Sequence, residues 1–183
     1  PGQERKEPLH IPLSVGLLAA DGRDLPLRMD DERTAGNSPT TRVLEIDRPV
    51  QTFRFVDVPE LPTPSVLRGF SAPVTVELPL DEESRLHLMA HDGDPFNRWQ
   101  AGQDLALDLL LRTIRDDRPS PADDRFVEAL GRTLEDPTLD PAFAAEMLAL
   151  PSEDAIADRM AVIDVEAVHL SLIHISEPTR LRR

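Results

Sequence analysis

Two histidines spaced four residues apart are the clearest candidates for chemistry in this 183-residue chain. His87 and His91 fall in a stretch with helical periodicity, and side chains at i and i+4 share one helix face, where both imidazoles could bind one zinc ion. A metallopeptidase helix needs a glutamate base directly after the first histidine, and Leu88 stands there. Because no third ligand lies nearby in sequence, we predict solvent-facing or hydrogen-bonded histidines and assign no metal ligand.

The acidic clusters are better explained as helix ends than as sites. The segment 91–94 (His-Asp-Gly-Asp) suggests calcium binding or acid–base chemistry, but Asp94 precedes Pro95 and is expected to cap a helix. Gly93 is expected to end the preceding helix in a left-handed conformation. The pairs 116–117 and 123–124 (Asp-Asp) are expected at solvated helix ends.

Other kinds of catalytic chemistry find no support in the sequence. Trp99, the sole tryptophan, lies three residues after Phe96, so core or inter-domain packing is favoured over a platform for ligand stacking. The chain has no cysteine, no Gly-x-Ser-x-Gly motif and no glycine-rich phosphate loop. We therefore predict no catalytic residue and no cofactor site within these residues.

Composition restricts the partners and the compartment. A formal net charge of −14 repels nucleic acid and anionic lipid, so neither is expected as a partner. We see no apolar run of membrane-spanning length and no signal peptide, and the absence of cysteine fits a reducing compartment, so a cytoplasmic location is expected. With 40% hydrophobic but only 4% aromatic residues, the core must be largely aliphatic.

The first 80 residues alternate apolar and polar side chains at period two, which predicts β-structure. After a loose arm at residues 1–8, a strand is expected over Ile11–Leu17, with Pro12 favouring a sheet edge, then a turn at Asp21-Gly22 and a return strand through Leu25 and Leu27. The other predicted strands are Val43–Ile46, Thr52–Val56, Val66–Phe70 and Val74–Leu78. Six short strands indicate an antiparallel, immunoglobulin-like β-sandwich. Because such sandwiches usually have about seven strands, we expect one more upstream of Pro1.

At Leu80–Asp81 the spacing between apolar residues changes from two to three and four. This change predicts helices over 81–169 after a sandwich domain over 9–80. Asp81 and the pairs Asp94-Pro95, Ser120-Pro121 and Asp140-Pro141 are expected to start four helices. Residues 105–111 are apolar apart from Asp108 and should pack on two sides. The later apolar stripes are Phe126, Val127, Leu130 and Leu134, and then Phe143, Met147 and Leu148. We expect stacked antiparallel helices in an unfinished array that self-associates through bare apolar faces.

Four blocks together resemble bacterial-type aminopeptidase N, a zinc aminopeptidase of the gluzincin class. They are Lys6–Leu18, Pro62–Val74, Asp94–Gln103 and Leu150–Glu153, and the resemblance covers about Gln3 to Val168. It implies that the chain is a fragment holding the small β-sandwich and the first helices of the C-terminal helical domain. The enzyme's zinc helix (H-E-x-x-H) and its Gly-Ala-Met-Glu-Asn segment would lie in a preceding catalytic domain, and neither occurs here.

The resemblance implies a structural function. In that family a zinc-bound water removes N-terminal residues from peptides, and a helical domain closes over the active site. The fragment would position this helical domain. Its partners would be the missing catalytic domain and the rest of the helical domain. Peptides would be the substrate of the parent enzyme, and zinc would be bound in the parent only. The alternative is an autonomous sandwich-plus-helix module that binds a protein without enzymatic activity.

The last residues follow a different pattern. Residues 170–183 resemble translated sequencing adapter, so we predict a non-native tail there. The alternative is an authentic short apolar segment with a basic end.

Overall fold

The computed structural model describes residues 8–32, 38–116, 124–137 and 139–176 of the chain. These residues pack as two compact units, Pro1–Arg98 and Trp99–Arg183. The first unit contains the β-structure, one helix and the first turn of a second helix. The long helix α2 (Pro95–Asp116) continues along the chain from one unit into the other.

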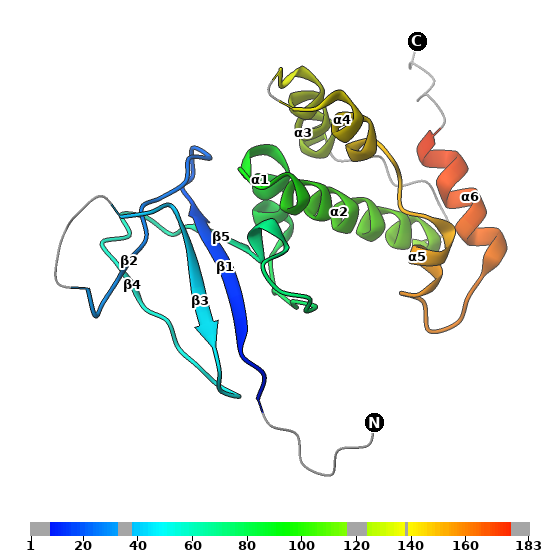
Figure 1. The fold of residues 1–183 in the computed structure, drawn as a ribbon. Coiled ribbons are helices and arrows are strands. Elements are labelled where there is room, and N and C mark those ends of the chain that lie inside the picture. Colours follow the sequence, from blue (N-terminus) through cyan, green and yellow to red (C-terminus); the bar gives the residue numbers. More distant parts are fainter. Residues whose placement is uncertain (1–7, 33–37, 117–123, 138, 177–183) are drawn as a thin grey trace. The chain divides into compact units, whose positions relative to one another are not determined.

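A three-stranded antiparallel sheet forms the larger layer of the first unit (Figure 1). Its central strand is β1 (Ile11–Leu18), which pairs with β3 (Thr41–Ile46) on one side and with β5 (Thr63–Val66) on the other. A second sheet pairs the two-residue strands β2 (Arg28–Met29) and β4 (Phe55–Val56). The sequence therefore predicted the antiparallel arrangement correctly.

Pro12 lies on the central strand, but at a place where only one side of it is paired. The ladder with β3 runs from Ile11 to Gly16, whereas the ladder with β5 begins at Val15. Proline is accepted here because its missing N–H leaves no partner strand unsatisfied. Beyond the end of β5, the Ser14 N–H donates instead to the Ser71 hydroxyl at 2.8 Å.

The core of the first unit lies between the two sheets and is largely aliphatic. Val15, Leu27 and Leu44 are buried there, and Phe53 and Phe55 pack against them from one face, as the alternation predicted. The remaining half-buried contacts to this cluster come from Leu13, Leu17, Met29 and Val66.

The predicted turn at Asp21-Gly22 is confirmed. Gly22 has a φ of 86°, which suits glycine, and its N–H donates to the Ala19 carbonyl at 2.9 Å. The chain returns through a single bridge between Leu18 and Asp24. Leu25 then lies buried with 2% of its surface exposed, so the return segment contributes to the core despite its short ladder.

Two of the predicted strands are wrong. The strand expected over Val66–Phe70 ends at Val66, and Arg68–Phe70 form the 3₁₀ turn η1. The segment expected as Val74–Leu78 forms no ladder within the described residues, although its side chains alternate. Alternation marks an extended backbone with two different faces, and here no neighbouring strand completes it.

The change of rhythm at Asp81 marks the first helix, as predicted. Asp81 caps α1 (Glu82–His91) by accepting the Ser84 N–H at 2.8 Å. The next residue after the helix, Asp92, still donates its N–H to the Leu88 carbonyl at 2.9 Å. The left-handed conformation expected at Gly93 is wrong, because the glycines with positive φ in the described chain are Gly22 and Gly69.

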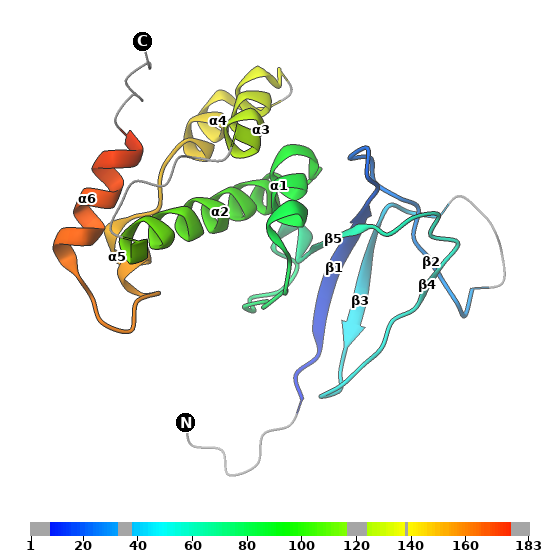
Figure 2. The same cartoon turned by 180° about the vertical axis from the view of Figure 1, so that it is seen from behind.

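The second unit is a group of helices around the later turns of α2. They are α3 (Asp124–Glu135), α4 (Pro141–Met147), α5 (Glu153–Ala157) and α6 (Val165–Ser176). Leu107 and Leu110 of α2 form a core with Ile156 and Val168, and Figure 2 shows α5 and α6 at that end of α2. Residues 105–107, 109 and 110 are buried around α2, as expected for packing on two sides.

Where the structure describes them, the helix starts of this unit follow the predicted pattern of a capping side chain at the N-terminus. Asp140 caps α4 with proline at the first helical position, whereas Ser120-Pro121 lies outside the described residues. Two helices beyond the four predicted are α5 and α6. Their start signals were Ser152, whose hydroxyl accepts the Ala155 N–H at 3.2 Å, and Asp164, which accepts the Ala167 N–H at 3.0 Å.

The predicted apolar stripes of α3 and α4 are only partly buried. Ala129 and Thr133 form the buried face of α3, while Val127 and Leu134 are 54% and 57% exposed. Met147 is buried in α4 and Leu148 is 44% exposed. The described helices therefore cover one side of α3 and leave an apolar strip on the other. The tail predicted from Leu170 begins inside α6, and its non-native origin stays a prediction.

Candidate functional site

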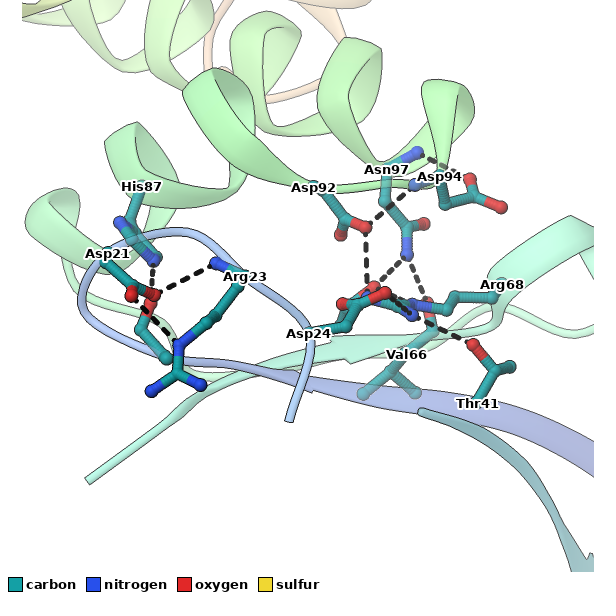
Figure 3. A network of polar contacts seen from close by, with 12 residues as sticks. Asp21, Arg23, Asp24, Thr41, Val66, Arg68, His87, Asp92, Asp94 and Asn97 are labelled. Atoms are coloured by element: carbon teal, nitrogen blue, oxygen red, sulfur yellow. Dashed lines mark hydrogen bonds and ion pairs between the residues drawn. The ribbon is translucent and has the colours of Figure 1, made fainter. Parts of the chain in front are cut away.

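A buried arginine in the first unit organises a highly connected polar cluster. All five N–H donors of the Arg68 guanidinium are used. Nη1 and Nη2 donate to the two oxygens of the Asp24 carboxylate at 3.0 and 2.7 Å (Figure 3). Nε donates to the Ser65 hydroxyl at 2.7 Å. Nη1 also donates to the Thr41 hydroxyl at 2.9 Å, and Nη2 donates to Asp92 Oδ1 at 3.3 Å. We call these five residues the Arg68 hub.

The backbone around Arg68 is shaped to place its side chain. Leu67, Gly69 and Phe70 have φ values of 65°, 62° and 51°, and left-handed leucine and phenylalanine are strained. The turn carries Arg68 back over β1, where Gly16 leaves room for the guanidinium. Phe70 contacts Phe96 with ring centroids 3.9 Å apart. Surrounding contacts thus hold a strained turn in one conformation.

The hub joins the sheet to the start of α2. Asp94 accepts the Asn97 N–H at 3.0 Å as the helix cap, and its second oxygen accepts the Gly69 N–H at 2.7 Å. The Asn97 side chain donates to the Ser65 hydroxyl at 2.9 Å and to the Val66 carbonyl at 3.1 Å. The first turn of α2 is therefore fastened to the end of β5 through Asn97 (Figure 3) and to η1 through Asp94.

The electrostatics of the hub are set by burial and by an excess of carboxylates. Burial alone would lower the pKa of Arg68, but the hydrogen bond to Asp24 and the charges of Asp92, Asp24 and Asp94 raise it above its usual value. Burial raises the pKa of Asp92, even though hydrogen bonds from Ser65 and from the Asp94 N–H, together with the charge of Arg68, act in the opposite direction. The arginine is a permanent cation here, whereas the ionisation of Asp92 is disfavoured.

The side chains of the hub do not make up the ligand set of a zinc site. Within the residues that the structure describes, no three His, Cys, Asp or Glu side chains are grouped so that they could hold a metal ion. The Arg68 donors are all engaged with protein acceptors, so the hub presents no free cation to a substrate. Its arrangement is suited to holding backbone segments together.

The histidines singled out by sequence have structural contacts. His87 donates from Nε2 to the Ala19 carbonyl at 2.8 Å, so one of the pair is hydrogen-bonded, as we expected. The two rings lie 5.0 Å apart, and His91 packs so closely on Gly22 that an added Cβ there would come within 2.5 Å of the ring. These histidines hold the turn after β1 against α1.

The other candidate residues lie where helix ends were expected. Asp116 ends α2 and Asp124 begins α3, both exposed, while residues 117 and 123 lie outside the described residues. Asp92 and Asp94 come together around the Arg68 turn. Sequence reasoning missed Arg68 and Asp24. The signal available for Arg68 was a single cation between Leu67 and Gly69 in a stretch that otherwise suited a strand.

Comparison with known families matches almost the whole chain. Residues 1–79 match a domain of unknown function, DUF3458, described as having an Ig-like fold. Residues 82–178 match its companion DUF3458_C, described as ARM repeats. The predicted immunoglobulin-like sandwich followed by stacked helices is therefore confirmed.

Named relatives agree with the resemblance found in the sequence. Aminopeptidase N of Caulobacter vibrioides is 41% identical over 162 residues, and that of Escherichia coli is 35% identical over 171 residues. These matches cover 88% and 92% of this chain, which spans only 17% and 19% of the two relatives. Aminopeptidase A of Legionella pneumophila, solved with aspartic acid, shares the fold over 91% of this chain and 18% of its own, with a TM-score of 0.70 and 23% identity. The chain therefore belongs to the aminopeptidase N family, within which it corresponds to the DUF3458 Ig-like domain and the ARM-repeat segment that follows it.

Proposed function

We propose that this chain is a non-catalytic scaffold of a cytoplasmic zinc aminopeptidase that removes N-terminal residues from peptides. Its sandwich would position the helical domain over the catalytic domain of the whole enzyme. The zinc and the peptide substrate would bind to the catalytic domain, and the described residues of this chain offer no grouped ligands for the metal. No helix among the described residues is long and apolar enough to span a bilayer.

The observation that carries the proposal is the Arg68 hub. Together with Asp94 and Asn97, the hub fastens the first turn of α2 to β5 and η1 through side chains whose donors and acceptors face one another and not an open site. Buried polar networks favour one local geometry, because a displaced partner leaves a buried group unpaired. A scaffold must fix the position and direction in which its helix begins, whereas a catalytic site needs hydrogen-bond donors that are available to a substrate.

A chimaera tests the positioning role. The matched segment of the Caulobacter vibrioides enzyme is replaced by this chain, and hydrolysis of an alanyl anilide is measured with and without Arg68→Ala. We expect the chimaera to be active and the variant to lose activity several-fold at a temperature where both remain folded. Arg48→Ala is the matched control, since that side chain is 74% exposed. Equal activity of all three proteins would contradict the positioning role.

The isolated chain provides the complementary measurement. It should bind no stoichiometric zinc and should not cleave the anilide substrate. An autonomous binding module is the competing function, and limited proteolysis separates the two. A self-sufficient module should resist cleavage from near Leu9 to near Ile163, whereas a part of a larger enzyme should be trimmed from both ends.

A further inference from the structure

The Arg68 hub contains more negative than positive charge. Its guanidinium is gripped by both oxygens of Asp24, while Asp92 receives one contact of 3.3 Å from it. Asp94 adds a third carboxylate beside the turn. One cation therefore faces three carboxylates, and Asp24 takes most of its charge.

Asp92 is the least favourably placed of the three carboxylates. Its side chain is 0% exposed, compared with 29% for Asp24. The Ser65 hydroxyl acts on this carboxylate, and Oδ1 accepts the Asp94 N–H at 2.9 Å and the contact from Arg68, but Oδ2 has no well-formed hydrogen bond among the described residues. Burying an ionised oxygen without a donor is costly, and a neutral carboxyl avoids most of that cost.

Among the charges that act on Asp92, that of Arg68 favours its ionisation and that of Asp94 opposes it. Asp92 follows the last residue of α1, where the backbone carbonyls present partial negative charge. On α1, His87 donates to the Ala19 carbonyl and His91 packs on Gly22. On α2, Arg98 directs Nε to the Met89 carbonyl at 3.3 Å. From the sheet side, the neighbours are the Ser65 hydroxyl, Arg68 and Asp24.

We propose that Asp92 is the proton-sensitive element of the Arg68 hub. It takes up a proton from solvent as the chain folds in acidic solution, and the neutral carboxyl holds the hub together better than the carboxylate does. The first turn of α2 is thus latched more firmly to the sheet when Asp92 is protonated than when it is ionised. This inference stands independently of the enzyme to which the chain contributes.

The sign follows from linkage. Burial raises the pKa of Asp92 in the folded chain above its ordinary value of 3.8. The stabilisation by the proton is therefore fully present below that ordinary value, and it is lost as the pH rises through the raised pKa. A carboxamide at this position is neutral at every pH, so a chain carrying Asp92→Asn should lack this loss.

Urea unfolding of the full chain between about pH 4 and about pH 8 tests the latch. The difference in unfolding free energy between Asp92→Asn and wild type should shift in favour of the variant as the pH rises. Asp31→Asn is the control, because Asp31 is an exposed carboxylate of the same unit, and its curve should parallel wild type. Parallel curves for wild type and Asp92→Asn would overturn the proposal, and so would a shift in the opposite direction.

A direct titration does not depend on the variant folding. The Asp92 carboxyl carbon, followed by ¹³C NMR in the wild-type chain, should titrate with a midpoint above the ordinary aspartate value of about 3.9. A midpoint at or below that value would show that the carboxylate is stable in the hub and would refute the latch.

Discussion

The guanidinium of Arg68 lies directly against the backbone of Gly16 on the central strand. A Cβ built on Gly16 would stand 2.1 Å from the Arg68 Cζ, far inside any van der Waals contact. The absence of a side chain at one position of β1 is thus what allows a charged group to occupy the sheet surface. The two residues are 52 positions apart in the chain, yet neither can change without affecting the other.

Gly16→Ala should be strongly destabilising. The added methyl must displace the guanidinium and break contacts to Asp24 and Ser65, so we expect a loss of about 3 kcal/mol in unfolding free energy. Gly131→Ala is the matched control, since nothing lies within 4 Å of an added Cβ on α3. That variant should gain about 0.5–1 kcal/mol from helix propensity. Denaturant unfolding followed by circular dichroism measures both, and an equal response would contradict the fit of Arg68 on Gly16.

Removing the Arg68 side chain should lower the unfolding free energy by more than the loss of one charge would. Arg68→Ala leaves Asp24 and Asp92 without their cation, and breaking one partner of a buried pair costs about 3–5 kcal/mol. Arg68→Lys should recover only part of this loss, because a single ammonium group cannot serve acceptors that lie around a planar fork. Thermal unfolding provides the comparison. A lysine variant as stable as wild type would show that charge alone matters at this position.

The cap of α1 should respond to acid in the opposite direction to Asp92. The hydrogen bonds from the Ser84 hydroxyl and N–H lower the pKa of Asp81 below its ordinary value of 3.8. The stabilisation by the ionised cap is therefore present above 3.8 and is lost as the pH falls through the lowered pKa. Asp81→Ala should weaken α1 at neutral pH, and the difference from wild type should shrink in acid. The Ser84 amide proton shift reports the titration, and a midpoint above the ordinary value would contradict it.

The exposed strip on α3 should drive self-association. Val127 and Leu134 are one heptad apart on the same side of the helix and both are more than half exposed. Light scattering at roughly 50 µM should detect oligomers despite the net charge, and Val127→Lys with Leu134→Lys should reduce them. Leu61→Lys is the control, since Leu61 is 95% exposed in the other unit. A monodisperse wild-type monomer would contradict the prediction.

Local signals in the sequence located most elements but not the hub. Asp81, Asp94 and Asp140 each capped the helix that the pattern predicted, because a cap and the N–H groups it accepts lie within three residues. The contacts of Arg68 with Asp24 and Thr41 instead span 44 and 27 residues. No periodicity encodes such a distance. The resemblance to a family supplied the fold of the whole, but it did not identify this cluster.

The false strand at Val74–Leu78 shows the limit of alternation. Its residues alternate as clearly as those of β1, yet a ladder also requires a second backbone at hydrogen-bonding distance. Phe70 illustrates a related limit, since a bulky residue with φ of 51° is stabilised by tertiary contacts, including the ring of Phe96. The sequence indicates where the backbone is extended, and tertiary neighbours determine whether that segment pairs in a sheet or turns away.

The family boundary near residue 80 does not coincide with a place where the chain can be divided. Asp92, Asp94 and Asn97 lie beyond that boundary, while Arg68, Gly69, Ser65 and Val66, to which they bind, lie before it. A gene split there would take the Asp92 contact from the guanidinium, and it would leave the Gly69 N–H, the Ser65 hydroxyl and the Val66 carbonyl without their partners Asp94 and Asn97. The two domains recognised by homology are therefore obliged to be inherited, expressed and engineered as one piece.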